Sequence, residues 1–336
     1  MKNILVTGGL GYIGSHTVVE LVNSGYNPVI IDDLSNSSHD VLSRIAKITG
    51  KDVPFFKADV SDTARVENIL KKHQIEGVIH FAAFKAVGES VAEPLKYYRN
   101  NIGGLVALIT AMQNCNVKNI VFSSSCTVYG EPDHSPVDES APVKMASSPY
   151  GNTKQIGEEI LRDCKFLNTL ALRYFNPIGA HDTALIGELP LGVPNNLVPY
   201  ITQTAAGIRQ QLTVFGSDYN TKDGTCVRDY IHVVDLAKAH VKAIAYIAQH
   251  PEVQFDVFNI GTGNGYTVLE IINAFESVNN IKLNYTIGER RAGDVEKVWA
   301  APQKAKDILG WEATLDLNAM VKSAWTWQEQ LRNNPL

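Results

Sequence analysis

A glycine-rich turn near the start of the chain constrains the fold more than any other feature. The apolar run Ile4–Val6 leads into Gly8-Gly9-Leu10-Gly11-Tyr12-Ile13-Gly14, and the amphipathic segment Ser15–Asn23 follows. A buried strand, spaced glycines and then a helix together form a cradle for a pyrophosphate at the helix N-terminus. Glycines alone would indicate only a turn, but this context predicts a dinucleotide site that includes Gly8, Gly11 and Gly14.

The residue that ends the second apolar run points to one dinucleotide. Val29–Ile31 is followed by Asp32, and residues 33–40 contain neither Arg nor Lys. A carboxylate at this place suits the ribose hydroxyls of NAD and repels the additional phosphate of NADP. We therefore expect NAD as the cofactor.

Strand-like runs alternate with helix-length segments through the first half of the chain. The runs are Ile4–Thr7, Pro28–Asp32, Pro54–Ala58, Gly77–Phe81, Asn119–Ser123 and Leu170–Tyr174. This rhythm predicts an α/β fold with a doubly wound parallel sheet, a Rossmann-type NAD-binding domain over residues 1–175. Ligands of such sheets bind beyond the carboxyl ends of the strands.

The regular alternation ends after Tyr174, where the chain becomes rich in proline. We expect residues 176–336 to form a smaller, mixed α/β C-terminal domain that binds the substrate. Val234–Ala248 is predicted as an amphipathic helix and Val257–Ile260 as a strand. Residues 234–262 are expected to return to the first sheet, so that the two domains are interleaved.

Composition excludes several classes of protein. The 336 residues carry a net charge of −5, and no run rich in Lys or Arg indicates a nucleic-acid partner. No apolar stretch is long enough to cross a membrane, and only Met1–Asn3 precede the first strand, which leaves no room for a signal peptide. The four cysteines lack metal-site spacing, so no metal is expected. These features favour a cytoplasmic protein.

Tyr150 and Lys154 are the strongest candidates for catalysis. They follow Ser148-Pro149, a typical helix start, and a spacing of four residues places both on one helix face. A lysine together with oxidised nicotinamide can lower the pKa of a phenol so that it serves as a base. Ser125 ends the fifth apolar run and could hold the reacting oxygen. Taken singly, such a pair is usually a solvated helix face, and serines usually make a polar strand end.

Nine segments, considered together, are similar to the extended short-chain dehydrogenase/reductase family, over nearly the whole chain. They are Gly8–His16, His80–Ala83, Lys85–Ser90, Ser123–Gly130, Ser148–Lys154, Leu172–Gly179, Pro194–Pro199, Val227–Val233 and Arg290–Asp294. The resemblance implies a catalytic set of Ser125, Tyr150 and Lys154. It further implies that NAD contacts Tyr12, Ile13, Asp32, Asp33, Leu34, Ser35, Asn36, Ser37, Asp59, Val60, Phe81, Ala82, Ala83, Phe84, Lys85, Asn100, Ser125, Tyr150, Lys154 and Phe175.

The same resemblance implies a UDP-hexose as the substrate. Its expected contacts are Lys85, Ser125, Tyr150, Asn176, Asn196, Leu197, Thr213, Phe215, Arg228, Arg291, Asp294 and Val298. Guanidinium groups bind diphosphate oxygens through paired hydrogen bonds, which suits Arg228 and Arg291. For Arg228 alone, an ion pair with Asp229 is the simpler interpretation, and Phe215 could equally be a core residue.

The activity that the resemblance implies is inversion at C4 of the hexose, which interconverts UDP-galactose and UDP-glucose through a 4-keto sugar. A nucleotide-sugar 4,6-dehydratase shares the first step, but that family carries an Asp-Glu pair where this chain has Cys126-Thr127. An inactive NAD-sensing regulator would be expected to lack Tyr150 or Lys154.

Two further expectations follow from the resemblance. It predicts a homodimer in which the helices Asn101–Asn114 and Thr153–Cys164 pair across a two-fold axis, although Leu105, Leu108, Ile109 and Met112 could instead be core residues. Val298 stands where family members restricted to unmodified hexoses carry tyrosine. A valine there leaves room for an N-acetyl group, unless a neighbouring side chain refills the space.

Overall fold

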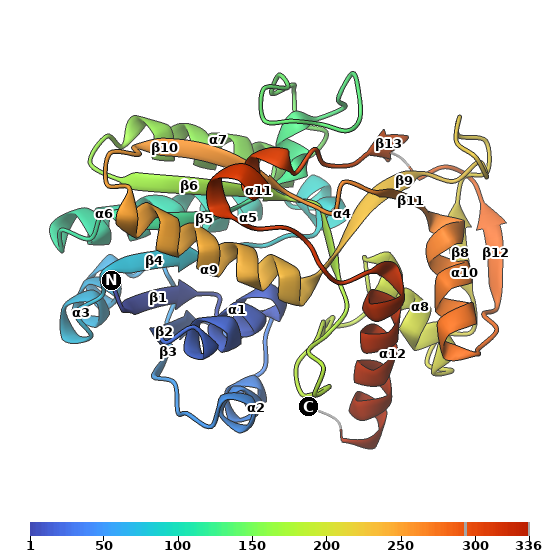
Figure 1. The fold of residues 1–336 in the computed structure, drawn as a ribbon, viewed down its shortest axis with the longest axis horizontal. Coiled ribbons are helices and arrows are strands. Elements are labelled where there is room, and N and C mark those ends of the chain that lie inside the picture. Colours follow the sequence, from blue (N-terminus) through green and yellow to red (C-terminus); the bar gives the residue numbers. More distant parts are fainter. Residues whose placement is uncertain (292–293, 335–336) are drawn as a thin grey trace.

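The computed structural model describes residues 1–291 and 294–334 and is organised around one large parallel sheet (Figure 1). The strand order is β10-β6-β5-β4-β1-β2-β3, and every neighbouring pair is parallel. The strands are β1 (Asn3–Thr7), β2 (Asn27–Asp32), β3 (Phe55–Lys57), β4 (Gly77–His80), β5 (Asn119–Ser125), β6 (Asn168–Tyr174) and β10 (Phe255–Ile260).

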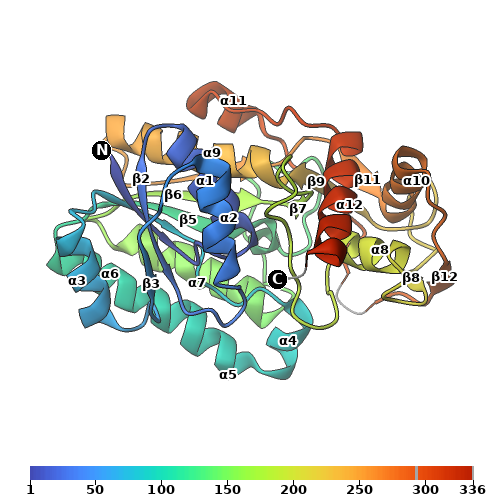
Figure 2. The ribbon, with the colours of Figure 1, turned by 90° about the horizontal axis from the view of Figure 1, so that it is seen from below.

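Helices cover both faces of this sheet, so its strands are buried on both sides (Figures 1 and 2). Ile4 and Val6 of β1 pack into the core on one face, whereas Leu5 packs into the core on the other. This double burial is why the strands are continuous apolar runs rather than alternating ones. One face carries α1 (Tyr12–Asn23), α2 (Asp40–Thr49), α9 (Val233–Gln249) and α11 (Gln303–Leu309).

The opposite face carries α3 (Thr63–Lys72), α6 (Gly104–Asn114) and α7 (Pro149–Asp163). Shorter helical elements join them: α4 (Val87–Ala92), α5 (Pro94–Tyr97), the π-helical turn η1 (Tyr98–Gly103) and the 3₁₀ turn η2 (Cys126–Tyr129). The helix predicted to start at Asn101 belongs to a longer helical run. Pro94 begins this run because a proline at the first helical position needs no hydrogen-bond acceptor for its nitrogen.

The second half of the chain builds a smaller layer beside the carboxyl ends of the large sheet (Figure 1). It contains β7 (Asn176–Ile178), β8 (Leu212–Phe215), β9 (Val227–His232), β11 (Gly265–Thr267), β12 (Tyr285–Gly288) and β13 (Lys297–Val298). Its helices are α8 (Leu197–Ala205), α10 (Val268–Asn279) and α12 (Leu317–Asn333), which pack around a separate apolar cluster.

The structure confirms the doubly wound parallel sheet and the smaller mixed layer. The predicted strand Val257–Ile260 lies within β10 at the edge of the large sheet, and α9 packs against α1. Where one domain ends and the other begins stays an interpretation. Within the described ranges, no helix is both long and apolar enough to cross a bilayer.

Candidate active site

A cavity of about 850 Å³ lies at the carboxyl ends of the strands of the large sheet, where the two parts of the chain meet. Its walls include Gly11 and Asp32 from the first half and Asn196 and Arg228 from the second. This is the position that parallel α/β sheets use for ligands. The cavity therefore collects residues that are far apart in the sequence.

The glycine turn at one end of this cavity is built without room for side chains. A Cβ atom on Gly14 would lie 2.2 Å from the carbonyl oxygen of Gly8, and Gly8 itself has a φ of +68°. No side chain of a described residue caps the N-terminus of α1, which leaves its first amide groups for another acceptor. This turn fits the pyrophosphate of a dinucleotide.

Asp32 lies on the cavity wall and is already held by its own chain. One carboxylate oxygen accepts the amide of Leu10 at 3.0 Å, and the other accepts the Leu34 amide at 3.0 Å and the Ser37 hydroxyl at 2.7 Å. A carboxylate offers about four acceptor positions, so one remains for a ribose hydroxyl. The loop thus fixes the carboxylate in place and leaves it able to bind NAD.

Tyr150 and Lys154 both lie on the cavity wall, in the first turns of α7. Ser148 caps this helix by accepting the Gly151 amide, and Pro149 occupies the first helical position, as expected from the sequence. The ammonium group of Lys154 donates to the carbonyl oxygen of Ser123 at 2.6 Å and lies 5.8 Å from the centre of the Tyr150 ring.

The protonation states in this part of the site are decided by burial. Burial raises the pKa of Tyr150 well above its ordinary value; the neighbouring Tyr174 raises it further, and a hydrogen bond with the Ser125 side chain opposes the rise. Burial also lowers the pKa of Lys154 to about 8, while Glu158 acts in the opposite direction.

Without NAD the pKa of Tyr150 therefore lies above its ordinary value, and the expected lowering by Lys154 together with oxidised nicotinamide stays a prediction. The ammonium group lies over the Tyr150 ring and donates to the end of β5, while burial has the largest effect on the pKa of the phenol.

Three of the residues expected around the UDP-sugar meet on one side of the cavity. Arg291 donates to the Asp294 carboxylate at 2.8 Å, and Arg228 approaches the same carboxylate to 3.8 Å. The alternative ion pair between Arg228 and Asp229 is not formed, because Asp229 is buried and accepts amides of the β10–β11 turn and of Ala300. Ala292 and Gly293, which share this segment, lie outside the described residues.

Glu188 is a cavity residue that the sequence reasoning missed. Its side chain accepts hydrogen bonds from the Asn196 amide at 2.7 Å and from the Lys85 ammonium at 3.2 Å. Lys85 and Asn196 come from different parts of the chain, so the carboxylate joins them across the cavity. Glu188 lies in an irregular, proline-rich stretch, where no strand or helix period places a side chain in advance.

Most of the expected site residues line this one cavity. They are Gly8, Gly11, Tyr12, Ile13, Gly14, Asp32, Asp33, Ser35, Asn36, Ser37, Asp59, Val60, Phe81, Ala82, Ala83, Phe84, Lys85, Asn100, Tyr150, Lys154, Asn176, Asn196, Arg228, Arg291, Asp294 and Val298.

Six expected residues are not on its wall: Leu34, Ser125, Phe175, Leu197, Thr213 and Phe215. Ser125 lies directly between two wall residues, Ser123 being two positions before it and Cys126 one after. Phe175 packs instead in a small buried cluster with Val298. Phe215 is 42% exposed, so its alternative role as a core residue is wrong; its ring lies 5.8 Å from the Arg291 guanidinium.

Comparison with known proteins places the chain among nucleotide-sugar enzymes. Residues 5–324 match the family described as GDP-mannose 4,6 dehydratase. A UDP-glucose 4-epimerase of Bacillus subtilis is 54% identical over 329 residues, which cover 97% of this chain and 96% of the relative.

Two solved structures agree with the fold over nearly their full length. A UDP-glucose 4-epimerase from Stenotrophomonas maltophila, with bound NAD and formylated UDP-arabinopyranose, has a TM-score of 0.96 and 47% identity, with 99% of each chain covered. The enzyme from Bifidobacterium longum, in complex with NAD⁺ and UDP, has a TM-score of 0.94 and 45% identity, with 100% of each chain covered. The chain belongs to the UDP-glucose 4-epimerase family, within the wider group that the GDP-mannose 4,6 dehydratase family describes.

Proposed function

We propose that this protein interconverts UDP-galactose and UDP-glucose by inverting the configuration at C4, with a tightly bound NAD. The observation that carries the proposal is the meeting of two residue sets on one cavity. Tyr150, Lys154, Arg228 and Arg291 all line the same cavity. A catalytic pair and a pair suited to a diphosphate can therefore contact one substrate. Relatives that are about half identical over nearly the whole chain are enzymes of this activity.

The roles of the residues follow from their chemistry. Tyr150 takes the proton from the 4-hydroxyl and later returns it, while Ser125 holds the oxygen. Lys154 supplies positive charge beside the phenol. Bound NAD supplies a reversible hydride acceptor; the glycine turn and Asp32 would hold it. The net redox change is zero, so no second substrate is needed.

The residues beside Ser125 argue against a dehydratase, despite the name of the wider group. Elimination of water across C5 and C6 requires an acid and a base, whereas Cys126 and Thr127 follow Ser125. Burial raises the pKa of the Cys126 thiol to about 12, so this thiol offers no base near neutral pH. A regulator without activity is disfavoured because Tyr150 and Lys154 are both present and both face the cavity.

Turnover of a single substrate tests the proposal. Purified protein with bound NAD is given UDP-galactose alone, and UDP-glucose is expected as the product. Tyr150→Phe is expected to lower kcat by about 10²–10⁴-fold, the range typical of general acid–base catalysis. Tyr26→Phe, which removes a half-buried phenol packed outside the cavity, is the matched control and keeps activity. A 4-keto-6-deoxy product, or no product, would contradict the proposal.

We also propose that the enzyme accepts N-acetylated UDP-hexoses. Val298 lies on the cavity wall and pairs with Arg228 across β13 and β9, next to the diphosphate-binding residues. Its buried cluster contains the small side chains Val128, Val137 and Ala300 together with two aromatic ones, Tyr129 and Phe175. A valine in these surroundings favours an open place beside the sugar.

We infer that the protein acts as a homodimer in the cytoplasm. Exposed apolar side chains on the helical run from α5 to α6 support the dimer, with Leu95 and Val106 exposed by 78% and 46%. All four cysteines are free thiols, which agrees with a reducing compartment. Cell fractionation with a tagged full-length chain tests the compartment.

A further inference from the structure

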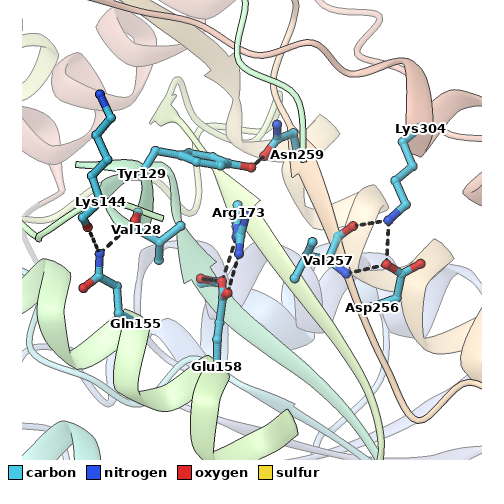
Figure 3. Close-up of polar contacts among 11 residues, drawn as sticks. Val128, Tyr129, Lys144, Gln155, Glu158, Arg173, Asp256, Val257, Asn259 and Lys304 are labelled. Carbon is cyan, nitrogen blue, oxygen red and sulfur yellow. Dashed lines mark hydrogen bonds and ion pairs between the residues drawn. The ribbon is translucent and has the colours of Figure 1, made fainter. Parts of the chain in front are cut away.

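A buried ion pair joins Glu158 of α7 to Arg173 of β6 (Figure 3). Arg173 of β6 donates to both carboxylate oxygens of Glu158, at 2.9 and 2.6 Å, and the two side chains are only 3% exposed. Ser124 of β5 donates to the same carboxylate at 2.5 Å. Glu158 stands one helical turn after Lys154 on α7, and Ser124 stands next to Ser125. The pair therefore touches both structural elements that carry the reaction.

The pair extends into a network that holds the turn after Ser125. The Arg173 guanidinium lies over the Tyr129 ring at 4.8 Å, and the Tyr129 hydroxyl donates to Asn259 of β10 at 2.7 Å. Gln155 of α7 donates to the carbonyl oxygen of Val128 at 2.8 Å (Figure 3). The 3₁₀ turn η2 is thus fixed to α7, β6 and β10 together.

We propose that Glu158 and Arg173 are positioning residues that set the charge on Lys154 and the place of Ser125. This inference rests on the proposed function, since it assigns the pair a part in that reaction. Burying an ion pair is costly unless its geometry and hydrogen bonds are good, and here the pair is bidentate with a further hydrogen bond from Ser124.

The charges around Lys154 support this role. The titratable groups that face it are Tyr150 on its own helix and His80 from β4, and Tyr174 from β6 acts on Tyr150. In the chain without NAD, burial keeps all three neutral, since it lowers the pKa of His80 to about 3 and raises the pKa of Tyr174 to about 12 and that of Tyr150 still further.

Lys154, Glu158 and Arg173 are themselves all buried, one carboxylate with two cations. Without the carboxylate, two buried cations would stand unopposed, and the ammonium group of Lys154 would lose its proton at lower pH.

The test measures the pKa of Lys154 directly and through catalysis. In protein labelled with ¹³C at the Cε of lysine, the Lys154 resonance (assigned by its loss in Lys154→Arg) is titrated by NMR, with and without NAD. The pH profile of kcat is recorded in parallel. Glu158→Gln is expected to move both the titration and the alkaline limb of the profile down by about 1 pH unit.

The neighbouring Glu159 provides a matched control, because Glu159→Gln removes the same charge from the same helix at an exposed position. It should leave the titration unmoved. Glu158→Asp, which keeps the charge, should return the Lys154 pKa most of the way to the wild-type value. A lysine titration that is the same in Glu158→Gln, Glu159→Gln and wild type would overturn the proposal.

Arg173 gives a test of opposite sign if Glu158→Gln does not fold. Arg173→Met removes a cation and is expected to move the Lys154 pKa upward. The double variant Glu158→Gln/Arg173→Met removes one charge of each sign and should bring the pKa back toward wild type. A change in stability without these shifts would mean that the pair is structural only. If the variants show these shifts but the wild-type protein does not turn over UDP-galactose, the proposed function is contradicted and the positioning of the Lys154 charge is not.

Discussion

Single residues at the site are governed by burial more than by the charges beside them. Tyr150 and Lys154 both lie in the cavity wall, and for each the largest effect on the pKa is desolvation. The spacing of the two residues indicated that the lysine would lower the pKa of the phenol, but spacing does not show how deeply each side chain is buried. A residue pattern therefore identified the groups, whereas their protonation states required the fold.

Gly14 offers a test of the dinucleotide turn. Because a Cβ atom there would lie 2.2 Å from the Gly8 carbonyl oxygen, the backbone of the turn must shift to accept any side chain. Gly14→Ala is expected to weaken NAD binding at least tenfold and to lower the melting temperature, measured by titration calorimetry and differential scanning calorimetry.

Gly103→Ala is the control for this change, since a Cβ atom at Gly103 would meet no other atom within 4 Å and the residue is helical. Equal NAD affinity in Gly14→Ala and wild type would mean that the turn does not hold the pyrophosphate.

Val298 tests the proposed breadth for substrates. Val298→Tyr would place an aromatic ring at a buried position of the cavity wall, beside Arg228. We expect the ratio of kcat/KM for UDP-N-acetylglucosamine to that for UDP-glucose to fall at least tenfold, since the ring takes the space of the acetamido group. A wild-type enzyme that ignores the N-acetyl sugar, or an unchanged ratio in the variant, would show that Val298 does not open the pocket.

At the scale of helices and strands, local pattern predicted the elements well and their partners less well. The first six runs are strands because each is apolar on both faces, and the predicted strand ends are correct to within two residues. The π-helical turn at Tyr98–Gly103 has no local signal of this kind. The Glu158–Arg173 pair could not be predicted either, since its two residues lie on different elements and meet only through tertiary packing.

The helical run from α5 to α6 carries the prediction of a dimer. Leu105, Leu108, Ile109 and Met112 are all core residues, so this part of the alternative interpretation is confirmed. The outward side chains Leu95 and Val106 remain for a partner. Sedimentation equilibrium should give twice the 36.8 kDa of one chain. Val106→Glu is expected to shift the protein toward the monomer, because it places a charge in an apolar contact.

Ile208→Glu is the matched control for the dimer, since Ile208 is also exposed but follows α8 in the other part of the molecule. A wild-type mass close to one chain, or the same monomer fraction in both variants, would argue against this interface.

At the scale of the whole molecule, the chain crosses between its two parts several times. It leaves the large sheet after β6 and builds β7, α8, β8 and β9 of the smaller layer. It returns through α9 and β10 and then completes the smaller layer with β11, α10, β12, β13 and α12 (Figure 1). The alternation of strands and helices predicted this sheet and the return of residues 234–262. The irregular stretch between β7 and α8 could not be placed in advance, and it is there that Glu188 joins Lys85 to Asn196.

The completed fold buries four histidines, and this leads to a prediction for stability against pH. Burial lowers the pKa of His16 and His80 to about 3 and the pKa of His232 and His240 to about 4. In the unfolded chain a histidine titrates near pH 6.5, so the unfolded state binds more protons below that value. Stability is therefore present above about pH 6.5 and is lost as the pH falls toward 4.

Each such histidine contributes about 1.4 kcal/mol of unfolding free energy per pH unit within this window. Burial raises the pKa of Asp229, Glu20 and Glu139, and these carboxyls act in the opposite direction, so a single variant isolates the effect of one histidine better than the total slope of unfolding free energy against pH.

His240→Phe keeps a ring against Phe81 and removes one titrating group. Urea unfolding at several pH values between 6 and 5 should give a slope that is smaller by about 1.4 kcal/mol per pH unit than in wild type. His134→Phe, at an exposed position, should leave the slope unchanged, and an equal slope in His240→Phe and wild type would mean that His240 takes up its proton in the folded protein.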